Sequence, residues 1–199
     1  MLIKKSQIPI LIFVLIYLIG ALFVFVSREN YEFVMYIAVI VFLFFVILLT
    51  NKKVNYPNFV LWGLSIWGLL HMLGGGLLLK GGTTRLYELI LIPLSSTYPI
   101  LRYDQFVHLF GFAVATLIMF VLLKPFLKYP IKKWTSISIL VIMAGFGVGA
   151  LNEMVEFIAT VLVPKTGVGG FINTSLDLVA DFIGAILAMT YIRMKKGEI

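Results

Sequence analysis

The sequence contains no cysteine and few charged side chains. Without cysteine, the chain has no disulfide framework, no zinc ribbon and no thiol nucleophile. Charged residues make up 13% of the sequence and hydrophobic residues 61%, whereas soluble domains carry roughly a quarter charged residues. This composition excludes an ordinary soluble domain and indicates an integral membrane protein.

Acidic residues are the scarcer of the two charged classes. There are 9 of them against 16 Lys and Arg, which gives a formal net charge of +7. A positive balance can indicate nucleic-acid binding, but here the basic residues stand in short groups beside apolar runs, where they orient a membrane protein. We therefore expect the lipid bilayer as partner and no nucleic acid.

Six apolar stretches are long enough to cross a bilayer, which requires about 20 residues of helix. They cover residues 7–27, 32–50, 58–79, 104–124, 135–162 and 171–192. The connections are short except for the one at 80–103, and no internal repeat is evident. The sequence therefore predicts an all-α polytopic membrane protein, a six-transmembrane-helix bundle forming a single integral membrane domain over 1–199, with a long outer loop between the third and fourth helices.

The distribution of Lys and Arg predicts the orientation, because these residues concentrate in cytoplasmic loops. One side of the predicted bundle carries Lys4, Lys5, Lys52, Lys53, Lys124, Lys128, Lys132, Lys133, Arg193, Lys195 and Lys196. The other side carries Arg28, Lys80, Arg85, Arg102 and Lys165. We expect a multi-pass protein of the cytoplasmic (inner) membrane with both termini in the cytoplasm.

Several ionisable residues lie inside or at the ends of the predicted spans. An ionisable side chain at the centre of a bilayer costs roughly 2.5–3.5 kcal/mol, so such residues normally face the interior of a bundle and serve a function. They are His71, Asp104, His108, Glu153, Glu156, Asp177 and Asp181. Because no Lys or Arg lies inside these helices, the carboxylates must be neutralised by protons, by bound cations, or by basic residues of the outer loops.

The spacing of these residues predicts that they converge. In each of the last three spans two of them are three or four residues apart, and residues at that spacing share a helix face. Small residues such as Gly111, Gly149 and Gly184 continue the same faces, and small residues let transmembrane helices approach closely. The acidic face of each helix is therefore expected to be its packing face, in the outer half of the membrane.

A ligand set of histidine and carboxylates favours Zn, Mn or Fe as the bound divalent metal ion, whereas an all-oxygen set would suit Mg. The predicted metal ligands are His71, His108, Glu153, Asp177 and Asp181, with Glu156 or Asp104 left as general base. Other interpretations stay open. His71 beside Trp67 can be a packing residue, Asp104 can cap its helix or mark the membrane boundary, and the remaining acids can form a structural hydrogen-bond network.

The sequence also resembles known membrane families. Its motifs are Trp67–Gly75, Leu86–Tyr87, Tyr103–His108, Asn152–Glu156 and Ser175–Gly184. Together they resemble the YjdF-type family of uncharacterised bacterial inner-membrane proteins. The last three motifs are distantly similar to the VanZ-like membrane family linked with glycopeptide resistance, whose Asp-x3-His, Glu and Asp-x3-Asp/Asn-x2-Gly pattern has the same order. That family usually has Gln and Arg after its glutamate, where this chain has Glu156 and no Arg before Asp181.

Three functions fit these features. The favoured one is a metal-dependent hydrolase or transferase that acts on a lipid or envelope precursor at the outer leaflet. In that case the 80–103 loop would serve as a lid, and its Ser95, Ser96 and Thr97 are candidate nucleophiles. The alternatives are a proton- or cation-coupled transporter, and a non-catalytic membrane factor whose polar network is structural.

Overall fold

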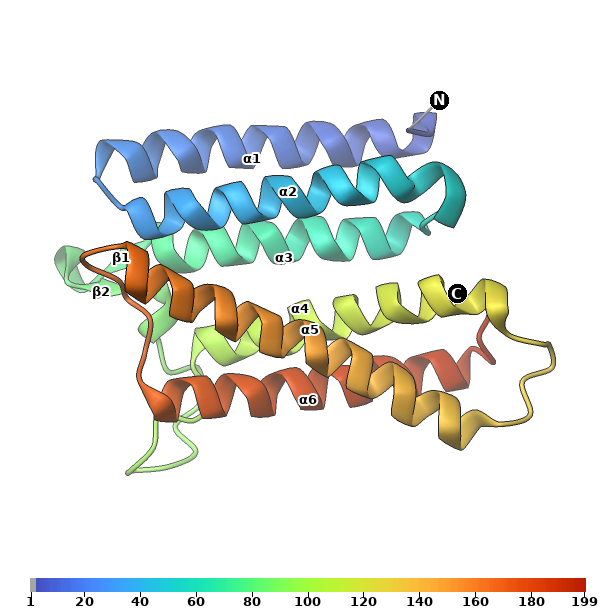
Figure 1. Cartoon of the computed structure of the whole chain (residues 1–199). Helices are drawn as coiled ribbons and strands as arrows, with labels where there is room; N and C mark the ends of the chain where they lie inside the picture. The colour runs from blue at the N-terminus through green and yellow to red at the C-terminus, as the bar shows by residue number, and fades with distance from the viewer. Residues whose placement is uncertain (1–2) are drawn as a thin grey trace. The chain divides into compact units, whose positions relative to one another are not determined.

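The computed structural model describes residues 3–199, which fold mostly into helices (Figure 1). The long helices are α1 (Ile8–Ser27), α2 (Tyr31–Val54), α3 (Asn58–Gly76), α4 (Tyr103–Leu123), α5 (Trp134–Leu162) and α6 (Phe171–Met194). The short elements are η1 (Lys5–Gln7), β1 (Leu78–Leu79), η2 (Lys80–Gly82), β2 (Thr84–Arg85), η3 (Leu86–Glu88) and η4 (Lys124–Phe126). Within residues 3–199, 6 helices are long and apolar enough to cross a membrane, which confirms the predicted fold class.

An asparagine stands at each end of α2, Asn30 before its first turn and Asn55 after its last. The Asn30 side chain accepts a hydrogen bond from the backbone N–H of Phe33 and so caps the first turn. At the other end Asn55 has φ 58°, in the left-handed region that commonly terminates helices. The helix therefore continues past the predicted end at residue 50, since the polar residues before Asn55 still complete its last turn.

The prediction that the third helix reaches residue 79 was wrong. α3 ends at Gly76, and Leu78 and Leu79 instead pair with Arg85 and Thr84 in an antiparallel hairpin. The turn contains Gly81 and Gly82 at φ 67° and 98°, a conformation that glycine adopts without steric cost. The backbone freedom of these glycines allows the chain to reverse where the apolar run alone predicted more helix.

The loop after the hairpin is closed by backbone hydrogen bonds between its two ends. The Leu91 N–H donates to the Leu101 carbonyl at 2.9 Å, and the Tyr103 N–H donates to the Leu89 carbonyl at 2.8 Å. An isolated bridge joins Ile90 and Arg102. The long loop predicted at 80–103 therefore exists, but it contains the second strand of the hairpin, two 3-10 turns and a closed end rather than an extended coil.

The chain divides into two compact units. The first comprises the residues up to Asp104 together with Val155–Val168, and the second comprises Gln105–Met154 and Gly169–Ile199. In the first unit α1, α2 and α3 lie side by side (Figure 1). Its core residues are Val14, Leu18, Phe25, Phe33, Tyr36, Ile37, Ile40, Met72 and Ala159.

In the second unit, α4, α6 and most of α5 pack around a separate core. Its buried residues are Phe120, Ile131, Val141, Met189 and Ile192. Large apolar side chains in both units are exposed, among them Phe23 at 77% and Phe171 at 86%. Exposed apolar surface of this extent on long apolar helices is what contact with lipid requires.

Candidate functional site

Three buried ionisable residues from three helices meet in the second unit. His108 lies on α4, Glu153 on α5 and Asp181 on α6, with exposures of 4%, 9% and 0%. The Nδ1 atom of His108 is 3.0 Å from Oδ1 of Asp181 and 3.7 Å from Oε1 of Glu153. One ligand atom from each residue lies within 4.8 Å of the other two. The structure thus brings together three of the five predicted metal ligands.

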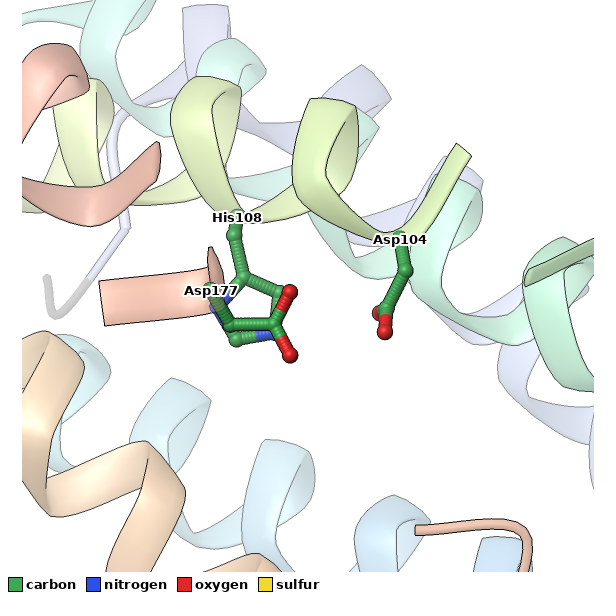
Figure 2. A group of neighbouring side chains, drawn as sticks. All are labelled: Asp104, His108 and Asp177. Carbon is green, nitrogen blue, oxygen red and sulfur yellow. The ribbon is translucent and has the colours of Figure 1, made fainter. Parts of the chain in front are cut away.

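Asp177 lies on α6 one turn before Asp181, and its side chain is fully buried. The Nδ2 atom of Asn173 donates a hydrogen bond to Asp177 Oδ2 at 2.5 Å. Asn173 is therefore a hydrogen-bond partner of a predicted ligand, whereas Gly170 occupies the N-cap position of α6. Figure 2 shows Asp177 in a second group with His108 and with Asp104, which precedes His108 by one turn of α4.

Close helix packing within the second unit explains why these side chains point inward. A Cβ atom added at Gly184 of α6 would collide with the backbone carbonyl of Leu109 on α4. A Cβ at Gly145 of α5 would collide with the Thr116 hydroxyl on α4. Both glycines continue the acidic faces of their helices, so the predicted use of small residues as packing faces is confirmed for these two contacts.

The two predicted general bases are placed by their own helices. Asp104 is in the first turn of α4, four residues before His108. Glu156 is three residues after Glu153 on α5. Both side chains are half-buried. Each therefore lies one helical turn from a member of the His108 group, on the same helix face.

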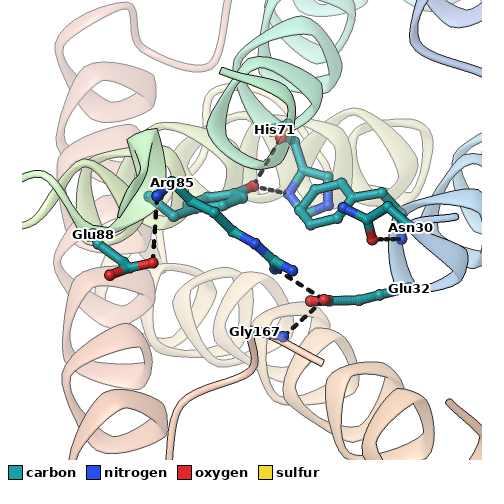
Figure 3. A network of polar contacts seen from close by, with 8 residues as sticks. Asn30, Glu32, His71, Arg85, Glu88 and Gly167 are labelled. Carbon is teal, nitrogen blue, oxygen red and sulfur yellow. Dashed lines mark hydrogen bonds and ion pairs between the residues drawn. The ribbon is translucent and has the colours of Figure 1, made fainter. Parts of the chain in front are cut away.

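His71 lies in the first unit among aromatic side chains (Figure 3). The Tyr87 hydroxyl is 2.5 Å from Nδ1 of His71 and donates to the His71 backbone carbonyl at 3.1 Å. The ring of Trp67 stacks on the imidazole with centroids 5.6 Å apart. Among the described residues, neither group with metal-ligand geometry includes His71. These contacts favour its packing interpretation, and its role as a ligand stays a prediction.

Tyr87 comes from η3, in the loop outside the membrane-spanning helices. Burial raises the pKa of the Tyr87 hydroxyl well above its ordinary value of 10.0, and the negative charges of Asp104 and Glu156 raise it further. Tyr87 is therefore a neutral phenol at physiological pH, with one hydrogen to donate. It fixes the position of His71 and holds the loop against the end of α3.

A buried ion pair in the first unit was missed by the sequence analysis. Glu32, 3% exposed in the first turn of α2, accepts from the Arg85 guanidinium at 2.9 Å and from the Gly167 N–H at 2.7 Å (Figure 3). The Arg85 guanidinium also lies 5.7 Å from the centre of the Phe33 ring. An arginine of the 80–103 loop therefore does neutralise a buried acid, but the acid is Glu32. The sequence signal was an acid at the first turn of an apolar helix, which is also an ordinary capping position.

Comparison with known proteins identifies the family. No curated protein and no solved structure matches the chain. The model of the family described as Predicted membrane protein (DUF2238) matches residues 9–197. This match runs from the second residue of α1 to beyond the end of α6 and includes all residues of the His108 group. The chain therefore belongs to the DUF2238 family of predicted membrane proteins.

Proposed function

We propose that this protein is a metal-dependent hydrolase or transferase of the inner membrane, acting on a lipid or an envelope-associated substrate from the extracytoplasmic side. The observation that carries the proposal is the meeting of His108, Glu153 and Asp181 at 3.0 and 3.7 Å in a buried part of the second unit. The first step is that this group binds a divalent metal ion, with Zn, Mn or Fe favoured over Mg.

The spacing of the ligand atoms supports a metal ion. Nitrogen and oxygen ligands lie about 2.0–2.2 Å from Zn, so two ligands of one ion are roughly 3–4 Å apart. The observed separations from His108 Nδ1 to Asp181 and to Glu153 fall in this range. Asp177, one turn along α6, is a further carboxylate for a fourth ligand or for orienting a bound water.

The charges in the second unit support the same conclusion. Glu153, Asp177 and Asp181 are buried. The helical segments of this unit, residues 105–123, 134–154 and 169–192, contain no Lys or Arg. His108 is therefore the only buried residue in these segments that can carry a positive charge. Buried carboxylates must be paired, protonated or bound to metal. A divalent ion offsets two negative charges at once and leaves His108 neutral as a ligand.

The chemistry follows from the groups around the ion. When bound, a metal of this kind lowers the pKa of a coordinated water and polarises a phosphoryl or acyl oxygen. Glu156 and Asp104, each one turn from a ligand residue, are the candidate general bases that would accept the proton of the attacking water or hydroxyl. Ser95, which is half-buried, and the exposed Ser96 and Thr97 stay the candidate nucleophiles for a transferase reaction.

The location is part of the proposal. The lysine and arginine distribution orients both termini to the cytoplasm, which would place His108 and Asp177 in the outer half of the membrane. A substrate that reaches this depth must be amphipathic, so lipids and lipid-linked envelope precursors fit best. The resemblance to YjdF-type inner-membrane proteins points to the same membrane.

Metal analysis of the purified protein tests the proposal. We expect about one Zn, Mn or Fe ion per chain after gentle purification, and loss of that ion in His108→Ala, Glu153→Gln and Asp181→Asn. Glu198→Gln is the matched control, because Glu198 is an exposed acid of the same unit. That variant should keep the metal.

The other outcomes discriminate between the alternatives. Wild-type protein without metal, combined with ion flux into proteoliposomes that disappears in Glu153→Gln, would replace the enzyme with a proton- or cation-coupled transporter. Absence of both metal and flux would leave the non-catalytic membrane factor. Metal retained in all three ligand variants would contradict the ligand assignment itself.

A further inference from the structure

The first unit contains an apolar groove between α1 and α2, at the end where α1 begins and α2 ends. The cavity has a volume of about 220 Å³. Its lining includes the buried residues Ile10 and Val14, whereas Val41 and Phe45, also in the lining, are 50% and 55% exposed. The groove is thus open at its side, on helices whose surroundings are lipid. An apolar groove in that position is suited to an acyl chain.

A buried amide pair closes the polar end of this groove. Asn51 Nδ2 donates to Gln7 Oε1 at 2.7 Å, and Gln7 Nε2 donates to Asn51 Oδ1 at 3.4 Å. Both residues line the cavity, and their exposed fractions are 4% for Gln7 and 6% for Asn51. Gln7 Oε1 also accepts the backbone N–H of Lys4 at 3.1 Å. The pair therefore fixes the start of α1 against the last turns of α2.

Four lysines flank the amide pair. Lys4 and Lys5 precede Gln7, while Lys52 and Lys53 follow Asn51 directly in the last turn of α2. All four side chains are exposed. No acidic residue occurs between residues 3 and 28 or between 33 and 57, so the positive charge at this end is not offset within α1 or along α2 beyond its first turn.

We propose that this groove is a binding site for an anionic phospholipid. One acyl chain lies between α1 and α2 over Ile10 and Val14, and the headgroup phosphate is held by the lysines beside the Gln7–Asn51 pair. Basic pockets at the ends of membrane helices recognise anionic headgroups because charge attraction and acyl burial act together. A second copy of the chain is disfavoured as occupant, since its own lysines would meet these.

The site is independent of the proposed metal group, and it would give the protein a lipid preference whatever reaction it performs. Native mass spectrometry of the full chain in detergent tests it, with phosphatidylglycerol and phosphatidylcholine as probes at equal concentration. We expect phosphatidylglycerol to bind preferentially. Its affinity should fall roughly tenfold or more in the variant Lys4→Gln, Lys5→Gln, Lys52→Gln, Lys53→Gln.

A matched variant separates this site from general charge attraction. Lys128→Gln, Lys132→Gln, Lys133→Gln, Lys195→Gln removes the same number of exposed lysines from the second unit. It should bind phosphatidylglycerol as the wild type does. An equal loss of affinity in both variants would overturn the proposal, as would equal binding of the two lipids by the wild type.

A second pair of variants tests the groove itself. Val41→Trp fills the lining from its exposed side and should lower phosphatidylglycerol binding with all lysines present. Phe42→Trp, at the adjacent exposed residue that does not line the cavity, should not. Unchanged binding in Val41→Trp would overturn the acyl-chain assignment. A dimer of the wild type that Val41→Trp abolishes would overturn it in favour of a second copy.

Discussion

Gly149 of α5 makes room for the carboxylate of Asp181 on α6: a Cβ atom at residue 149 would collide with the Asp181 Oδ2 atom. Gly149 lies one turn before Glu153 on the same helix face. Gly149, which lets α5 and α6 approach, is therefore a neighbour on the helix surface of Glu153, a member of the His108 group. The close packing of α5 on α6 and the position of the Asp181 carboxylate both require that residue 149 has no Cβ atom.

Gly149→Ala tests this relationship. The added methyl group should displace Asp181 and lower the free energy of unfolding by about 1–3 kcal/mol, the usual cost of overpacking. We also expect less bound metal, measured together with thermal stability in detergent. Gly147→Ala is the control, because a Cβ there has nothing within 4 Å. If both variants behave alike, Gly149 has no special role in the group.

The Arg85–Glu32 ion pair should stabilise the first unit. Arg85→Gln removes the ion pair and leaves the buried Glu32 carboxylate with its hydrogen bond from the Gly167 N–H. Because the Arg85 side chain is 27% exposed, the expected loss in the free energy of unfolding is moderate, about 1–2 kcal/mol. Chemical denaturation in detergent micelles measures it.

A change at Glu32, the partner of Arg85, tests whether the cost of Arg85→Gln comes from leaving a buried charge without its cation. Glu32→Gln removes the buried charge, so it should cost less than Arg85→Gln. Lys165→Gln, at an exposed residue of a nearby loop, should leave stability unchanged. Equal stability of Arg85→Gln and wild type would show that the ion pair contributes nothing to the fold.

Tyr87→Phe should separate the two interpretations of His71. The change removes the hydroxyl and with it the contacts to the Nδ1 atom and the backbone carbonyl of His71, which should lower the free energy of unfolding by about 1–2 kcal/mol. We expect bound metal to be retained, because the proposed ligands lie on α4, α5 and α6. Tyr98→Phe, at an exposed loop tyrosine, is the control. A drop in metal affinity of roughly 10–100-fold would instead indicate that Tyr87 orients a ligand histidine.

A reporter fused after Lys196 should give a cytoplasmic signal. The expectation follows from the greater number of Lys and Arg on the side of the termini. A matching fusion in the 80–103 loop should report the opposite side. A periplasmic signal after Lys196 would invert the bundle and place the His108 group in the inner half of the membrane.

Much of the fold follows from local sequence. The six spans are predicted because long apolar runs have one stable solution in a bilayer, the helix, which satisfies its own backbone hydrogen bonds. The end of α3 is not predictable in the same way. Leu77, Leu78 and Leu79 continue the apolar run, and only the turn at Gly81 and Gly82 with its strand pairing takes them out of the helix.

The residues of the candidate group were selected by sequence alone, because ionisable side chains inside apolar helices are costly and therefore few. Spacing predicted that each helix presents its acids on one face, and the contacts of Gly145 and Gly184 confirm that two of these faces pack closely. Which acids meet was decided by tertiary structure. His108 contacts Asp181 and Glu153, whereas Glu32, which no pattern singled out, receives Arg85.

The sequence by itself determined that the chain lies in a membrane, how many times it crosses, and which few residues are too polar for that surrounding. Those properties depend on composition and on helical periodicity, both of which are local. Tertiary structure alone decided the partners: Tyr87 for His71, Arg85 for Glu32, Asn51 for Gln7. Each of these contacts joins residues from different elements, and their meeting depends on how whole helices and loops pack.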